Sequence, residues 1–238
     1  MLENGFSTTE RCNSIWEKYK TLMRLHSIRR TGVKNHGICV SPLYLADQNV
    51  QEHSYLVTAL AVIMYSMFEE IQEYFPPNFI ETLLFHDIGE TKIGDIPDDG
   101  TAEAIAKKDA QEFKFLSEFV EDFDYDTAEG ILADFGRLQR KGNILYMLDK
   151  LEWIFFVGHL TPSGDAGSMN YKETHLGLTE QDKHAIEVTG SYRTVDAMVV
   201  HFLEHTRGIK GRDVMVSLIE SMYMSIDGLI PAFVGELY

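Results

Sequence analysis

The chain has 238 residues, of which 45% are hydrophobic and 24% charged, and its formal net charge at pH 7 is -16. Such a composition fits one large globular domain, and two cysteines make a poor case for a disulfide scaffold. The sequence contains no run of 18 apolar residues and no signal-peptide pattern, so we expect a cytoplasmic protein without a membrane span. The acidity disfavours binding to a nucleic-acid polymer, whereas one divalent cation and a few basic side chains can hold a small anion.

Apolar residues recur three and four positions apart through most of the chain, which predicts helices and little or no sheet. We expect helices near 14–27, from about 52 to Pro76, and near 79–91, 102–123, 127–139, 143–159, 179–187, 192–206 and 212–229. The segment from His53 to Phe75 is apolar on almost every face until Glu69, so it is expected to run through the middle of the domain. Gly and Pro at 94–100 and Gly and Ser at 161–170 predict loops.

A histidine and an aspartate, His86 and Asp87, stand at the end of an apolar helical segment. Glu90 follows at i+4 from His86 and i+3 from Asp87, so in a continuous helix the three side chains can converge. Buried carboxylates are costly unless a cation compensates them, and a divalent metal compensates two at once. The segment therefore predicts part of a metal site.

Two more polar residues are expected on the buried faces of other predicted helices. His53 begins the most apolar helix, and Asp149 lies inside NILYMLDKLEWIFF, which has a core-facing side. Taken alone, such a histidine is more often a cap or a satisfied core group, and such an aspartate often pairs with a lysine such as Lys150. Together with His86 and Asp87, they form a mixed nitrogen and oxygen set suited to Mn, Co, Zn, Fe or Mg.

A second histidine pair, His201 and His205, has the i, i+4 spacing of a zinc pair. The segment HFLEH lacks the glutamate beside the first histidine that zinc proteases have. We therefore interpret both as partly exposed helix residues.

Four motifs along the chain resemble those of the HD-domain superfamily of metal-dependent phosphohydrolases. Three of them supply the metal ligands, and the fourth is a loop. Its pattern is a single His, then His-Asp, then a distant Asp, and the chain has His53 in NVQEHS, His86-Asp87 in FHDIGE and Asp149 in LDKLE. The chain is most similar to the branch that contains bacterial 5'-deoxynucleotidases and oxetanocin-type phosphohydrolases. That branch carries a Gly-Asp-(Ile/Leu)-Pro loop after the HD motif, where this chain has GDIP at 94–97.

The resemblance implies an all-α HD-domain helical bundle with extra C-terminal helices. We expect one domain over 1–238, with the motif core at about 28–160 and a helical extension at about 161–238. It also implies one divalent metal ion held by His53, His86, Asp87 and Asp149. Relatives in this branch often dimerise, so a homodimer is a further expectation.

The same resemblance implies roles for residues around the metal. Glu90 would position or deprotonate the attacking water, and Asp95 would orient the nucleotide or the catalytic network. Arg30 matches an arginine that contacts the substrate phosphate. Thr31 stands where relatives commonly have tryptophan, which leaves base or sugar selection open.

The predicted function is release of phosphate from a nucleotide, most of all a (deoxy)nucleoside 5'-monophosphate. One alternative keeps the metal and changes the substrate to a nucleoside triphosphate or another phosphomonoester. The other alternative is a non-catalytic, metal-stabilised module that senses nucleotides. The product, which is phosphate, pyrophosphate, tripolyphosphate or none, distinguishes the three.

Overall fold

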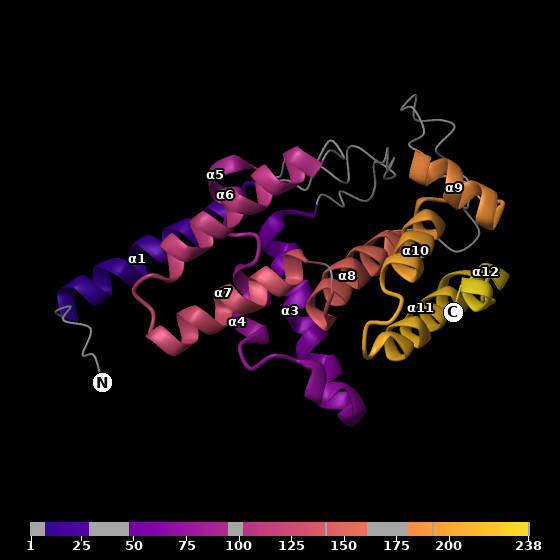
Figure 1. The fold of residues 1–238 in the computed structure, drawn as a ribbon, viewed down its shortest axis with the longest axis horizontal. Helices are drawn as coiled ribbons and strands as arrows, with labels where there is room; N and C mark the ends of the chain where they lie inside the picture. Colours follow the sequence, from indigo (N-terminus) through magenta and orange to yellow (C-terminus); the bar gives the residue numbers. More distant parts are fainter. Residues whose placement is uncertain are drawn as a thin grey trace. The chain divides into compact units, whose positions relative to one another are not determined.

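The computed structural model describes residues 8–28, 48–94, 102–140, 142–160, 180–191 and 193–237. These residues form helices, and no strand is assigned among them, which confirms the predicted all-α class (Figure 1). None of the helices in these ranges is long and apolar enough to cross a bilayer. Contacts divide the chain into two compact units whose segments alternate along the sequence. The organisation of 1–238 as one domain stays a prediction.

The first unit takes its described residues from 1–31, 48–64 and 75–140. Its helices are α1 (Thr8–Leu25), α3 (Val50–Met67, up to residue 64), α4 (Phe79–Phe85), α5 (Glu90–Ile93), α6 (Ala102–Val120) and α7 (Tyr125–Gln139). Helix α6 packs on α7, α4 also packs on α7, and α1 contacts α5. This unit carries the HD sequence.

One apolar cluster joins most of these helices. Its buried members are Leu25, Val50, Ile88, Leu116, Phe119, Val120, Ile131 and Phe135. Burying a side chain of this size stabilises the fold by about 1.5–3 kcal/mol. Because Ile88 is 2% exposed, this cluster anchors the turn that carries His86 and Asp87.

The second unit takes its described residues from 65–74 and 142–237. Its elements are the 3-10 helix η1 (Glu69–Tyr74) and the helices α8 (Ile144–Leu160), α9 (Glu180–Thr189), α10 (Thr194–His205), α11 (Arg212–Asp227) and α12 (Ala232–Leu237). Helix α8 packs against α10 and α11. Arg193 joins α10 to α11, donating to both oxygens of Asp196 at 2.9 and 2.8 Å and to Asp227 at 2.6 Å.

The predicted helices are found with shifted ends, and three features differ. The helix expected from 52 to Pro76 begins at Val50 and ends at Met67, before η1. The continuous helix over 79–91 is wrong, because α4 ends at Phe85 and turns follow. Helix α12 was not predicted. Of the expected loops at 94–100 and 161–170, only Gly94 lies within the described residues.

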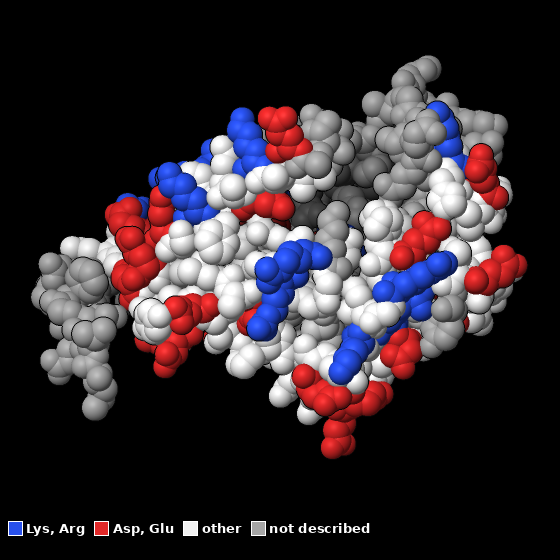
Figure 2. Space-filling model, in the orientation of Figure 1, with Lys and Arg blue, Asp and Glu red and all other residues white. Residues whose placement is uncertain are grey.

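Charged side chains of both signs are interspersed on the face of the molecule shown in Figure 2. Because the chain has 37 acidic and 21 basic residues, a nucleic-acid polymer would meet net repulsion. The small anionic substrate stays a prediction.

Two glycines of α7, Gly130 and Gly136, have different neighbours, so their substitution by alanine should change stability differently. A Cβ at Gly130 would lie 1.8 Å from the side-chain amide of Asn78, the residue before α4, whereas a Cβ at Gly136 would meet only Arg140, at 4.0 Å. We expect Gly136→Ala to stabilise the protein by about 0.5–1 kcal/mol, since alanine favours a helix. Gly130→Ala should be less stable than Gly136→Ala, because the Asn78 side chain must move aside to admit the methyl group. Urea unfolding of both variants measures the difference, and equal effects would contradict the contact.

Candidate metal centre

His53 is positioned by the first turn of α3. The backbone N–H of Glu52 donates to the Asn49 side chain at 2.9 Å, and the N–H of Asn49 donates to the Glu52 carboxylate at 3.1 Å. This reciprocal pair is a capping box, which satisfies two otherwise unpartnered amides and fixes where the helix begins. A bond from the Val50 N–H to the Ile28 carbonyl at 3.0 Å also holds this end. The His53 side chain, one residue later, is fully buried.

His86 follows directly after α4 and is 4% exposed. Its Nδ1 lies 2.6 Å from the carbonyl oxygen of Leu83. Because a carbonyl oxygen only accepts, Nδ1 must carry the proton of this bond. In the neutral ring, Nε2 then carries a lone pair, which is the form of histidine that binds metals.

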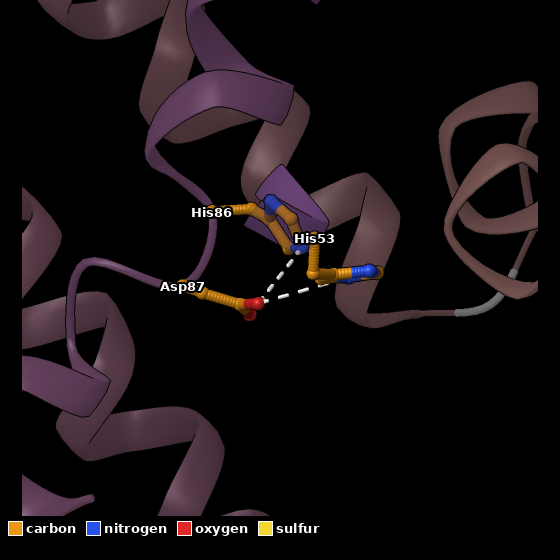
Figure 3. A group of neighbouring side chains, drawn as sticks. All are labelled: His53, His86 and Asp87. Carbon is orange, nitrogen blue, oxygen red and sulfur yellow. Dashed lines mark ion pairs between the residues drawn. The ribbon is translucent and has the colours of Figure 1, made fainter. Parts of the chain in front are cut away.

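His53, His86 and Asp87 converge on one point (Figure 3). Asp87 Oδ2 lies 3.3 Å from His86 Nε2 and 3.8 Å from His53 Nε2. The candidate ligand atoms of all three residues lie within 4.8 Å of one another. Two atoms that bind one ion at about 2.0–2.2 Å are separated by at most about 4.4 Å. The separations here, of up to 4.8 Å, come close to that limit, so small side-chain movements would allow all three residues to bind one ion.

The electrostatics of this cluster favour a cation. In the neutral ring, the His86 Nε2 lone pair lies 3.3 Å from a carboxylate oxygen of Asp87, so two acceptors face each other. Burial makes this arrangement costly, since both imidazoles are buried and the Asp87 side chain is only 14% exposed. A proton on the imidazole or a metal ion removes the repulsion, and two histidines with one carboxylate are a common set for first-row divalent metals.

Glu90 belongs to the same turn but not to the three-residue cluster. Its N–H donates to the carbonyl oxygen of Asp87 at 3.0 Å, and its side chain is 4% exposed. The bonds of this segment run from each residue to the third one before it, so the predicted α-helical convergence of His86, Asp87 and Glu90 is wrong in its geometry. His86 and Asp87 nevertheless meet, because the turn points both inward.

Asp149 lies on α8, in the second unit, where it is 8% exposed. Its Oδ2 is 2.8 Å from Nζ of Lys150, which is the pairing considered from the sequence. Its place as a fourth metal ligand remains a prediction. Arg30 and Asp95 lie outside the described residues, as does Thr31.

Glu112 was not predicted, although it packs directly behind the HD turn. A Cβ at Gly89 would lie 2.8 Å from Cα of Glu112, so α6 touches the turn through its backbone. The Glu112 side chain is buried, with Lys108 Nζ at 3.6 Å. Burial raises the pKa of Glu112 to about 7; the charge of Asp87 adds to the rise and Lys108 opposes it. The sequence held one signal, because Glu112 precedes Leu116 by four residues on the apolar face of α6.

The rings of His201 and His205 lie side by side on one face of α10, tilted by 32° with their centroids 3.9 Å apart. Nδ1 of His205 donates to the carbonyl of His201 at 2.9 Å. His201 is partly exposed and His205 is exposed, which confirms the interpretation of both as partly exposed helix residues.

The described helices and their His-His-Asp cluster are those of a helical protein that could hold a metal ion. Residues 22–183, about two thirds of the chain, match the model of the HD domain family, and the chain belongs to that family. No curated protein and no solved structure is significantly similar to it. HD domains bind divalent metals and are generally metal-dependent hydrolases, and the family suggests phosphohydrolase activity here.

Removing one ligand should remove the ion. We expect Asp87→Ala to lose bound metal and to lose the rise in Tm that added Mn, Co or Zn gives the wild type, because an ion that binds only the folded state stabilises it by mass action. Elemental analysis and thermal unfolding with and without chelator measure both effects. The exposed Asp126→Ala is the matched control. Equal metal content in Asp87→Ala and Asp126→Ala would contradict the assignment.

Glu112 predicts a pH dependence of stability. Its pKa is about 7 in the folded protein against 4.5 as the ordinary value. Between these values Glu112 is ionised in the unfolded chain but still protonated in the folded protein, so the free energy of unfolding falls as pH rises from about 4.5 to 7. Above pH 7 the carboxylate is ionised in both states, and the whole loss of stability is present. In metal-free protein we expect Glu112→Gln to be more stable than wild type at pH 8, by at most about 3 kcal/mol. Urea unfolding should show this difference vanishing near pH 4.5; a constant difference would refute it.

Proposed function

We propose that this protein releases phosphate from a nucleotide, with a (deoxy)nucleoside 5'-monophosphate as its principal substrate. The observation that carries the proposal is the buried cluster in which His86 Nε2 and Asp87 Oδ2 face each other at 3.3 Å within an HD domain. The nucleotide follows from the sequence GDIP at 94–97, which resembles the loop of the 5'-deoxynucleotidase branch.

The metal would be held by His53, His86 and Asp87, with Asp149 proposed as the fourth ligand. A divalent ion supplies positive charge to the phosphoryl oxygens and makes nearby water more acidic. Because Nδ1 of His86 is taken by the Leu83 carbonyl, Nε2 is the nitrogen of this ring that would bind the ion.

We assign Glu90 as the base that accepts a proton from the attacking water. Its carboxylate is buried in the turn that also carries Asp87, and its backbone is tied to Asp87 by a hydrogen bond. A buried carboxylate near a cation stays ionised and can accept a proton. Arg30 would clamp the phosphate, because a guanidinium can bind it through two parallel bonds, and Asp95 would orient the nucleotide.

Two other functions keep the same metal site. A nucleoside triphosphate or another phosphomonoester is the alternative substrate, and Thr31 in place of a tryptophan keeps this alternative open. A nucleotide sensor would bind without turnover. The buried Glu90 favours a hydrolase over a sensor, since a sensor has no use for a base and burial of a carboxylate is costly.

The deciding experiment is a nucleotide screen across Mn, Co, Mg and Zn. Mono-, di- and triphosphates of ribo- and deoxynucleosides are incubated with the metal-loaded protein, and phosphate, pyrophosphate and tripolyphosphate are measured separately. Phosphate from monophosphates supports the proposal. Pyrophosphate or tripolyphosphate from triphosphates selects the alternative substrate, and nucleotide binding without any product selects the sensor.

Within this screen, Glu90→Gln tests the base. The amide has the shape of the carboxylate and cannot accept the proton, so we expect kcat to fall about 100- to 10,000-fold. Metal content should stay at the wild-type value. Glu118→Gln, on the exposed side of α6, is the control for the same chemical change. Full turnover by Glu90→Gln would remove Glu90 from the proposed mechanism.

A further inference from the structure

A cavity of about 570 Å³ lies in the second unit. It is lined by the connection from α9 to α10, the first turn of α10, the connection from α11 to α12, and α12 itself. Its lining residues all follow residue 183, where the match to the HD domain family ends. The cavity is therefore outside the part of the chain that carries the HD motifs, and its volume suits a small molecule.

Arg193 and Asp196 line this cavity and belong to a network of charged groups. Nε and one Nη of Arg193 donate to the two oxygens of Asp196, and the other Nη donates to Asp227 at 2.6 Å. The hydroxyl of Tyr223 donates to Asp196 Oδ1 at 2.7 Å. All three nitrogens of the guanidinium thus bind carboxylates of the protein, and the two carboxylates outweigh the one cation. An anionic ligand would gain little from an arginine that is neutralised in this way.

Glu236, on α12, adds a further negative charge to the lining. Its side chain is exposed, and it has no hydrogen bond or ion pair with any residue that the structure describes. Asp196, Asp227 and Glu236 together carry three negative charges against the one positive charge of Arg193. The field in the cavity therefore favours a cation.

The end of α9 acts in the same direction. Gly190, in left-handed backbone with φ 65°, follows this helix, and its N–H donates to the carbonyl of Ile186 at 2.8 Å. Val188 and Thr189, which end the helix, line the cavity. The last carbonyls of a helix carry the negative end of its dipole, and a nearby cation stabilises them. The last turn of α9 has no basic residue that could do so, whereas the start of α10 is already offset by Asp196 in its first turn.

The rest of the lining includes several apolar side chains. Leu229, Pro231 and Phe233 contribute them at the connection from α11 to α12 and at the start of α12. Leu229 is 59% exposed, whereas Phe233 is only 6% exposed. A ligand with an apolar body would cover Leu229, and the apolar area removed from water would favour binding.

We propose that this cavity binds a small organic ammonium ion, that is, a protonated amine attached to an apolar body. The ammonium group lies between Glu236 and the carbonyl end of α9, and the apolar body contacts Leu229 and Phe233. A metal ion would leave the apolar wall uncovered, and an anion would meet an excess of negative charge. The site shares no residue with the HD cluster, so it does not rest on the proposed function.

Binding of phenethylamine to the full chain tests the ligand class. At pH 7 we expect isothermal titration calorimetry to show phenethylamine binding at least about tenfold more tightly than 2-phenylethanol or phenylacetate, which have the same ring but a neutral or a negative end. Added salt should weaken the binding of phenethylamine and leave any binding of 2-phenylethanol unchanged. Equal affinities for the three compounds, tighter binding of phenylacetate, or no binding of phenethylamine overturns the proposal.

Two variants test whether the binding takes place in this cavity. Glu236→Gln removes the exposed carboxylate, so phenethylamine should bind about two- to fivefold more weakly; Glu118→Gln, on the exposed side of α6, is the control for this change. Ala232→Trp puts an indole at an exposed position of the lining and should abolish binding, whereas Ala133→Trp, at an exposed position of α7, should not. Circular dichroism and Tm show that each variant folds. Wild-type affinity in either Glu236→Gln or Ala232→Trp overturns the assignment of the site.

Discussion

The hydrogen bond from His86 Nδ1 to the carbonyl oxygen of Leu83 is the interaction on which the candidate metal centre depends. Helix α4 ends at Phe85, so the Leu83 carbonyl is among the last four of the helix, which lack a regular helical partner. The His86 ring takes that place. A continued helix would have given this carbonyl to the backbone of Asp87, leaving the orientation of the His86 ring open. The end of α4 therefore turns Nδ1 toward the helix and Nε2 toward Asp87.

The second candidate ligand nitrogen, in His53, is placed by the start of a helix. The capping box of Asn49 and Glu52 sets the first turn of α3, and His53 falls on the inward side of that turn. Two helix ends from distant parts of the sequence thus supply the two imidazoles. Helix ends suit this purpose because their unpartnered backbone groups can orient a side chain, whereas the middle of a helix satisfies its own.

The sequence predicted the helices well because their periodicity is a local property. It predicted the end of α4 poorly: nothing in LLFHDIGET breaks a helix except Gly89, and that glycine is needed for a contact with Glu112, more than twenty residues away. The start of α3 was predicted near residue 52, two residues late, although Asn49-x-x-Glu52 has the spacing of a capping box. Arg30 and Asp95 were assigned by resemblance alone, whereas Asp149 was also a candidate because it lies in an apolar helical segment. No local pattern relates any of the three to the cluster, because Arg30 and Asp149 lie far from it along the chain and Asp95 lies in the predicted loop at 94–100.

Under the proposed function, the acidity of the site makes substrate binding conditional on the metal. Asp87, Glu90 and Glu112 all lie in or against one turn, and a phosphate monoester would bring about two more negative charges to it. Without a cation, the carboxylates would repel the substrate in a buried region where charges are weakly screened. With a cation, the same carboxylates would hold the ion and the ion would attract the phosphate. We therefore expect the metal to bind before the substrate.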